Sequence, residues 1–83
     1  VENQLSKNEY ILSGRLEISH INKEFNLDIP EGEYDTLSGF IIAHHETIPE
    51  KNEIIEIDKF KFKIMDVSET KIETTKLEVL PKE

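Results

Sequence analysis

Cysteine is absent from this chain of 83 residues, and its absence removes several classes of site at once. Without thiols the chain has no disulfide framework, no thiolate zinc site and no redox-active cysteine pair. Long apolar runs are missing as well, because the longest is Phe40–Ala43, whereas a membrane-spanning helix needs about eighteen or more apolar residues. The composition therefore favours one small domain with a modest core.

Basic residues are also few, since ten lysines and arginines stand against eighteen acidic residues and give a formal net charge of -8. This charge repels nucleic-acid phosphates and anionic lipid headgroups, so we expect no nucleic-acid binding and no direct membrane binding. It offers carboxylates to cations or to basic partners instead.

The local motifs of catalysis and phosphate binding are missing too. The chain has three glycines and neither GxGxxG nor GxxxxGK[ST], so no phosphate-binding loop is predicted. No serine lies in a GxSxG motif. Acid pairs such as Glu31/Glu33 and Glu53/Glu56 arise by chance in a chain with 34% charged residues. We therefore predict no enzyme and no catalytic residues.

The first ten residues, VENQLSKNEY, are polar and resemble a linker more than the start of a core. We predict a linker over residues 1–9 and a single domain over residues 10–83, cut from a longer protein. Tyr10–Leu12, closed by Ser13 and Gly14, predicts a short strand.

Two helices are predicted in the first half of the domain. The spacing of Ile18, Ile21 and Phe25 predicts a helix over about Ser19–Asn26, with Ser19 as its cap and Pro30 as its limit.

The second helix has the clearer start, because Thr36 is a preferred N-cap residue. An apolar stripe of Leu37, Phe40 and Ile41 follows, and Pro49 limits the helix. Gly39 costs about 1 kcal/mol relative to Ala inside a helix. We explain the presence of glycine at this position by another backbone element that crosses closely there. The alternative is a ligand that approaches at Gly39.

From Asn52 onward the pattern predicts three antiparallel strands in a meander, with breaks after Ile57 and Val67. Ile72 and Leu77 have opposite parity, which predicts a bulge near Thr74 and Thr75. Together these elements predict an α+β fold, in which two helices pack on one face of a mostly antiparallel sheet of about four strands.

The second helix ends in His44, His45 and Glu46, and two interpretations are open. The zinc-protease motif HExxH is excluded because Pro49 stands where its second histidine belongs. Neighbouring helical residues point about 100° apart, so a shared metal ion would need a further ligand from His20, from Glu50 or from a carboxylate of a second subunit. Alternatively, one histidine borders the apolar stripe, the other is solvated, and both complement the helix C-terminus when protonated.

The segments ILSGRLEI and LDIPEGEYDTLSGFII are followed by an Ile-Pro turn and the later strands. This order of motifs resembles the transporter-associated CorC/HlyC domain, from about Tyr10 to Leu80. The positions that match the family's helix start and turn are Tyr34, Thr36, Leu37, Gly39, Phe40 and Pro49. Glu46 and Asn52 depart from the pattern, because the family commonly has glycine at both. His45 stands at a usually apolar position, which implies that it is partly buried.

The resemblance implies a fold related to FAD-binding α+β domains but does not imply that flavin binds, and we expect no cofactor. It implies a domain at the C-terminus of hemolysin-like or magnesium/cobalt-efflux proteins, on the cytoplasmic face of the inner membrane. The expected partners are the CBS and transmembrane domains of the same protein, or a second copy. We expect a regulatory module; the alternative is a sensor that binds a divalent cation or small nucleotide, with His20, His44 and His45 as candidate metal ligands.

Overall fold

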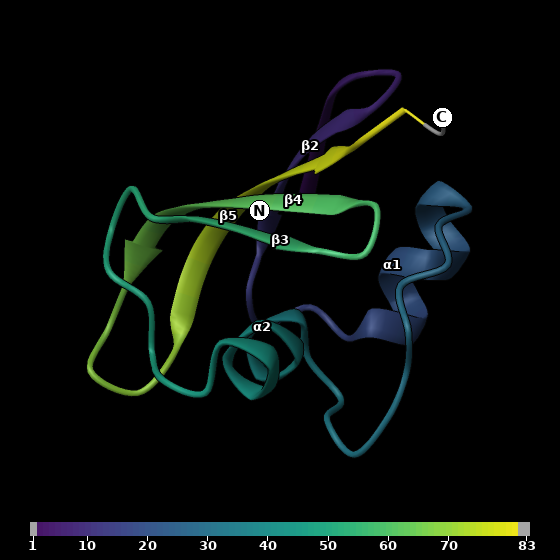
Figure 1. Ribbon diagram of the computed structural model, residues 1–83. Helices are drawn as coiled ribbons and strands as arrows, with labels where there is room; N and C mark the ends of the chain where they lie inside the picture. The colour runs from purple at the N-terminus through teal and green to yellow at the C-terminus, as the bar shows by residue number, and fades with distance from the viewer. Residues whose placement is uncertain (1, 82–83) are drawn as a thin grey trace.

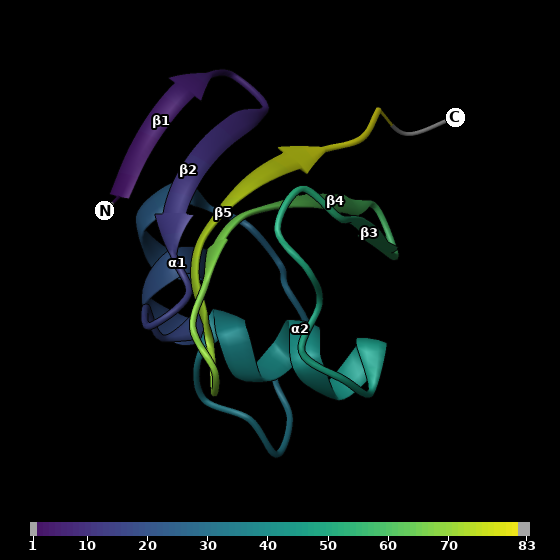
Figure 2. The same cartoon turned by 90° about the vertical axis from the view of Figure 1, so that its left-hand side faces the viewer.

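The computed structural model describes residues 2–81, which form a five-stranded sheet with two helices on one face (Figure 1). In chain order the elements are β1 (Glu2–Ser6), β2 (Glu9–Ser13), α1 (Ile18–Phe25), α2 (Leu37–His45), β3 (Ile54–Ile57), β4 (Phe60–Val67) and β5 (Ile72–Val79). The strand order is β1-β2-β5-β4-β3, and every neighbouring pair is antiparallel. The turned view shows the sheet curving over both helices (Figure 2). The predicted α+β architecture is confirmed.

The first strand corrects the prediction at the N-terminus, because residues 2–6 form β1 rather than a linker and raise the number of strands from four to five. Glu2 pairs with Leu12 and Gln4 pairs with Tyr10. All five residues of β1 are exposed, so this strand lacks the apolar alternation by which strands are recognised. Residue 1 of the predicted linker and residues 82–83 of the predicted domain lie outside the described residues.

The meander of three strands in the second half is confirmed. In β4 every second side chain from Phe60 to Ile64 is fully buried, while the lysines between them face the other side. The register of β4 with β5 shifts twice, as Ile64 faces Thr75 and Val67 faces Ile72. This irregularity lies next to the predicted bulge and lets β5 direct both Ile72 and Leu77 into the core.

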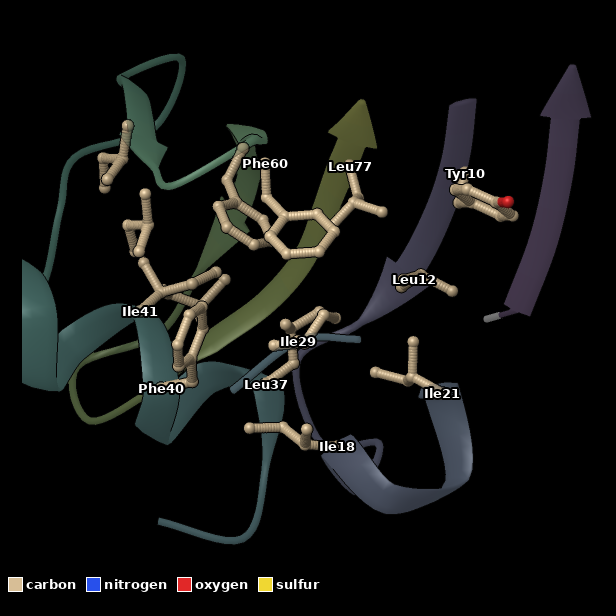
Figure 3. Packing of buried hydrophobic residues seen from close by; sticks show 14 of the residues in the cluster. Tyr10, Leu12, Ile18, Ile21, Ile29, Leu37, Phe40, Ile41, Phe60 and Leu77 are labelled. Atoms are coloured by element: carbon tan, nitrogen blue, oxygen red, sulfur yellow. The ribbon is translucent and has the colours of Figure 1, made fainter. Parts of the chain in front are cut away.

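The core lies between the helices and the sheet, and Figure 3 shows its side chains pointing inward from both layers. Burial of these apolar surfaces is the main term that stabilises the domain. The buried hydrophobic residues are Tyr10, Leu12, Ile18, Ile21, Ile29, Leu37, Phe40, Ile41, Ile55, Ile57, Phe60, Phe62, Ile64, Ile72 and Leu77.

Helix α1 begins one residue earlier than predicted, and Ser19 is not its cap. The N-cap residue is Glu17, whose side chain makes no capping bond. The Ile18 amide instead donates to the Asp35 carbonyl at 2.9 Å, so the chain just before α2 holds the start of α1. The helix ends at Asn26, which has a left-handed φ of 54°.

Helix α2 begins as predicted, because Thr36 is its N-cap and its hydroxyl accepts a bond of 3.1 Å from the Gly39 amide. The helix ends at Glu46, which has a left-handed φ of 75° and donates its amide to the Ile42 carbonyl at 2.7 Å. Asn52 also has a positive φ, of 73°. Both positions at which the family commonly has glycine therefore adopt the conformation that favours glycine.

The expected crossing of backbones at Gly39 is wrong. A Cβ atom there would lie 3.2 Å from the Cβ of Tyr34 and 3.4 Å from the Thr36 hydroxyl, so side chains rather than a second backbone surround it. The close backbone approach occurs at Gly14, where a Cβ atom would lie 2.0 Å from the Ile72 carbonyl oxygen. Ser38 completes this junction, because its amide donates to the Gly14 carbonyl at 2.8 Å and its hydroxyl accepts from the Ile72 amide at 2.9 Å.

Candidate functional site

An open groove of about 770 Å³ lies between strand β3 and the C-terminal end of helix α2. Tyr34 and Pro30, from the loop before α2, form part of its wall. His44 and His45 also line it, so the fold brings both histidines of the HHE segment to this one surface. Because the two histidines occupy successive positions on the helix, they point in different directions and have different neighbours.

His44 is exposed and lies against aromatic rings. Its ring centroid is 4.8 Å from that of Phe40 and 6.5 Å from that of Tyr34, and the Tyr34 and Phe40 centroids are 5.3 Å apart. His45 turns toward the chain that enters β3, and its Nε2 lies 3.0 Å from a carboxylate oxygen of Glu53. With 27% of its side chain exposed, His45 is partly buried, as the resemblance implied.

The third histidine lies in a different place. His20 of α1 has its Nε2 at 2.6 Å from a carboxylate oxygen of Glu2 on β1. Glu24, one turn further along the helix, completes a group whose three ligand atoms all lie within 4.8 Å of one another. Within residues 2–81 neither His44 nor His45 belongs to such a group of three.

Sequence reasoning missed both glutamates of the His20 group. Glu24 follows His20 by four residues, so the shared helix face was a signal that could have found it. Glu2 gave no such signal, because its segment was assigned to a linker and only the pairing of β1 with β2 places it beside α1.

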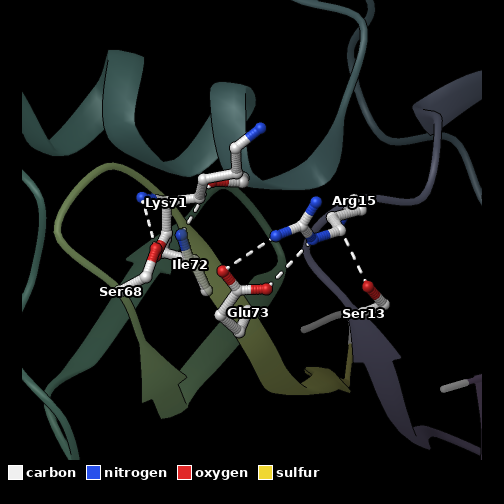
Figure 4. A network of polar contacts seen from close by, with 7 residues as sticks. Ser13, Arg15, Ser68, Lys71, Ile72 and Glu73 are labelled. Carbon is white, nitrogen blue, oxygen red and sulfur yellow. Dashed lines mark hydrogen bonds and ion pairs between the residues drawn. The ribbon is translucent and has the colours of Figure 1, made fainter.

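A second depression, of about 340 Å³, borders Gly39 at the other end of α2. Gly14, Arg15 and Lys71 also line it. Arg15 holds Glu73 through two bonds, Nε to Oε1 at 3.0 Å and Nη2 to Oε2 at 3.2 Å (Figure 4). The hydrogen bond from Arg15 is the main cause that lowers the pKa of the Glu73 carboxyl. The arrangement is an exposed ion pair that ties the chain after β2 to β5.

None of these surfaces assembles a reacting pair. Among residues 2–81 no serine hydroxyl hydrogen-bonds a histidine, and the acidic residues beside the large groove, Glu56 and Asp58, are both exposed. The groove offers an apolar wall, two imidazoles and carboxylates, which is chemistry suited to binding.

A family model described as the transporter associated domain, CorC_HlyC, matches residues 3–81. The chain belongs to this CorC/HlyC family. The resemblance that the sequence predicted is thereby confirmed, and the match begins within β1, so the family's domain includes the strand that was predicted as linker.

Three curated relatives of the CorC/HlyC domain are similar at 31% identity. They are the magnesium and cobalt efflux protein CorC of Buchnera aphidicola from Baizongia pistaciae (61 residues, 74% of this chain and 22% of that protein), hemolysin C of Brachyspira hyodysenteriae (75 residues, 89% and 28%) and an inner membrane protein of Escherichia coli (67 residues, 81% and 16%). The chain therefore spans less than a third of the length of these relatives. No helix within residues 2–81 has the length and apolar character needed to cross a membrane.

Two solved structures share the fold. A Haemophilus influenzae protein of unknown function has a TM-score of 0.87 and 30% identity, covering 96% of this chain and 99% of that one. The CorC_HlyC domain of a Xylella fastidiosa hemolysin, solved in complex with Mg²⁺ and Mn²⁺, has a TM-score of 0.77 and 21% identity, covering 96% and 98%. Both solved chains consist almost wholly of the domain, so in those two structures the domain has this fold without a further domain in the same chain.

The residues that carry the resemblance gather at the start and end of α2. Thr36 caps the helix, Leu37 and Phe40 are fully buried, and Tyr34 packs on Phe40. Pro49 is buried after the helix end. In this CorC/HlyC domain the motif therefore positions helix α2 and contributes Tyr34 to the wall of the large groove.

Proposed function

We propose that this CorC/HlyC domain is a non-enzymatic regulatory part of a hemolysin-like or magnesium/cobalt-efflux membrane protein. It modulates ion transport through contacts with the CBS and transmembrane domains of the same protein, or with a second copy of itself. It lies on the cytoplasmic face of the inner membrane and meets the membrane only through its parent protein. The observation that carries the proposal is the match of residues 3–81 to a transporter-associated domain.

The surface of the domain supports a role in contacts. The helices cover one face of the sheet, and the other face is open, as are the outer edges of β1 and β3. Among the described residues three large apolar side chains are exposed, namely Leu5 on β1, Ile48 after α2 and Ile54 on β3. Apolar side chains and strand edges at a surface are the features through which modules of this size bind other chains.

The test is ion efflux from cells that carry the parent protein with or without residues 2–81. We expect transport to persist without the domain, while its dependence on the internal magnesium or cobalt concentration changes. Identical rates and identical ion dependence in the two proteins would contradict a regulatory role. Expression of both proteins in the membrane is measured in parallel, so that loss of the protein is distinguished from loss of regulation.

A second candidate function is direct sensing of a divalent cation, and the Glu2, His20 and Glu24 group favours it. One imidazole with two carboxylates suits cobalt, zinc or manganese, whereas magnesium prefers oxygen ligands alone. The Mg²⁺ and Mn²⁺ complex of the similar Xylella fastidiosa domain gives this candidate a precedent in the fold. A nucleotide is the less suitable ligand, because the net charge of -8 repels its phosphates.

Thermal unfolding of the isolated domain with magnesium, cobalt, manganese or zinc tests the sensor. A ligand at 100 times its dissociation constant stabilises the folded state by about 2.7 kcal/mol, which raises the midpoint by several degrees in a small domain. We expect His20→Ala to abolish the shift and the double variant His44→Ala/His45→Ala to keep it. No shift with any ion, or a shift that survives His20→Ala, removes this candidate.

A further inference from the structure

Strand β3 has a free edge. It is the last strand of the sheet order, so only β4 pairs with it. Its four residues are Ile54, Ile55, Glu56 and Ile57, without the lysine or proline that commonly guards an edge strand. The Ile54 side chain is 53% exposed. Such an edge is suited to the addition of another strand.

The hairpin between β3 and β4 decides which backbone groups point outward. Asp58 and Lys59 form a two-residue turn, and Ile57 faces Phe60 across it. The residues that flank a two-residue turn form a hydrogen-bonded pair, and the pattern then alternates along an antiparallel ladder. Ile55 and Ile57 therefore bond to β4, while the amide and carbonyl groups of Ile54 and Glu56 point to the free edge.

The side chains along this edge also alternate. Ile55 and Ile57 point to the helix side, where the groove of about 770 Å³ continues past β3 toward Tyr34 and Pro30. Glu56 points to the opposite, open face and is exposed, and Glu56 forms no ion pair among residues 2–81. An added strand would thus direct one set of alternate side chains into an apolar groove and the other set beside a carboxylate.

We propose that the free edge of β3 binds an extended segment with alternating apolar and basic residues, which adds to the sheet as a sixth, antiparallel strand. Its apolar residues lie opposite Ile55 and Ile57 and enter the groove beside α2. Its basic residue lies opposite Glu56 and exchanges both backbone hydrogen bonds with it. This inference rests on the proposed function, because it names the surface and the chemistry of the partner through which the domain acts.

Charge decides between a foreign segment and a second copy of the chain. A two-fold pair of β3 strands would bring two identical surfaces together, each carrying Glu56 and Asp58, in a chain of net charge -8. Like charges opposite one another destabilise a strand pair. A basic segment forms cross-strand pairs of opposite charge in the same positions. We therefore infer that the partner is a basic segment and not a second copy of this chain.

The probe is a blocked octapeptide in which valine and lysine alternate, added to the ¹⁵N-labelled domain. We expect the Ile54 and Glu56 amides to gain protection from hydrogen exchange, while the Ile55 and Ile57 amides, already bonded to β4, change little. The same peptide with glutamate in place of lysine should not bind. Binding that leaves the Glu56 amide unprotected is diffuse attraction to an acidic protein, and it would overturn the proposal.

Methylation of the peptide backbone tests strand pairing separately from charge. In the antiparallel arrangement the lysine amides point to β3 and the valine amides point away. N-methylation of the lysines should abolish binding, whereas N-methylation of the same number of valines should preserve it. Equal effects of the two methylations contradict the added strand.

Two variants of the domain complete the test. Glu56→Lys should weaken binding of the peptide by roughly five- to tenfold, and Glu69→Lys, which makes the same charge change in the exposed turn between β4 and β5, should leave it unchanged. Ile54→Pro removes one outward amide at the first position of the strand, where proline is tolerated, and should also weaken binding. If Glu56→Lys and Glu69→Lys weaken binding equally, the peptide does not bind at the β3 edge.

The same variants, placed in the parent protein, separate this inference from the proposed function. If deletion of residues 2–81 alters the ion dependence of transport but Glu56→Lys and Ile54→Pro do not, the regulatory function stands and the β3 edge is not its contact. If the deletion itself has no effect, the proposed function fails, whatever the peptide does.

Discussion

Glu46 ends helix α2 in the left-handed conformation, with a φ of 75°. This region costs a residue with a Cβ atom about 1–2 kcal/mol, and glycine avoids that term while it loses more backbone entropy on folding. We expect Glu46→Gly to stabilise the domain by about 1 kcal/mol, measured by urea unfolding.

Glu46→Ala is the matched control, since it removes the same charge but keeps the Cβ atom. It should give no gain in the free energy of unfolding. If alanine stabilises as much as glycine does, the effect comes from the charge, and the argument from backbone conformation is wrong.

The Ser38 hydroxyl makes its hydrogen bond to strand β5 rather than within helix α2. Its hydroxyl, in a buried residue, accepts from the Ile72 amide at 2.9 Å, at the point where β5 begins. Ser38→Ala leaves that amide without a partner in the core, which should cost about 1–3 kcal/mol of stability. Urea unfolding measures the loss.

Ser68 provides the comparison, because its hydroxyl also accepts from a backbone amide, that of Lys71 at 3.2 Å, but in an exposed turn. Water can replace that bond, so Ser68→Ala should change the free energy of unfolding by less than about 1 kcal/mol. Similar losses in the two variants would show that burial does not set the effect.

At the scale of the strands, like charges meet across the open face of the sheet, where Glu9 of β2 lies opposite Glu78 of β5 and a lysine of β4 lies opposite a lysine of β5. Lys63 of β4 lies directly opposite Lys76 of β5, whereas Lys61 lies between Glu56 on β3 and Glu78 on β5. Like charges directly opposite one another are destabilising by roughly 0.2–1 kcal/mol. We therefore expect Lys63→Glu to raise the thermal midpoint.

Lys61→Glu makes the same change of charge on the same strand, but it places a glutamate opposite both Glu56 and Glu78 and should lower the midpoint. The difference between the two variants should shrink at about 1 M salt, where exposed charges are screened. Two shifts of the same sign would show that net charge, rather than the cross-strand neighbours, governs stability on this face.

The helices and strands differ in how well their sequences predicted them. Helix α2 carries its own signals, a threonine cap and a buried stripe, and β4 alternates without interruption, so both were predicted correctly. Strand β1 is wholly exposed and forms as a strand by pairing with β2, so its sequence holds no signal of burial. The start of α1 was misplaced because the backbone of Asp35, far along the chain, holds it in place of a cap.

The candidate sites were less predictable for a related reason. The groove joins β3 to α2 and to the loop at Tyr34, and this depends on the strand order, which periodicity does not determine. The histidines were recognised as potential ligands, yet the carboxylate that lies closest to His20 comes from β1. Tertiary pairing, rather than local pattern, places these groups.

For the whole molecule, two carboxylates link stability to pH. Lys59 lowers the pKa of Asp28, and Arg15 lowers the pKa of Glu73, chiefly through side-chain hydrogen bonds. A group whose pKa is lower in the folded state contributes stability above its ordinary pKa and loses it as the pH falls through the folded value. The ordinary values are 3.8 for Asp28 and 4.5 for Glu73, so we expect stability to fall as the pH drops below about 4.5.

Thermal midpoints of the wild type and Glu73→Gln between pH 7 and pH 2 test this link. The wild type should lose its advantage over the variant as the pH drops below 4.5, because the exposed pair with Arg15 disappears when Glu73 is protonated. Glu69→Gln removes the same charge from a turn and is the control for net charge. A constant difference between wild type and Glu73→Gln down to pH 2 would contradict the assignment.

The strand order also governs when the domain can fold. Strand β5 is the last element of the described chain, yet it lies at the centre of the sheet, between β2 and β4. Until β5 leaves the ribosome, the β1–β2 hairpin and the β3–β4 hairpin have no strand to join them, and the inner edges of both stay open. Synthesis of the domain therefore ends with the one strand on which its cooperativity depends, and a nascent chain that pauses before Ile72 exposes two unpaired half-sheets.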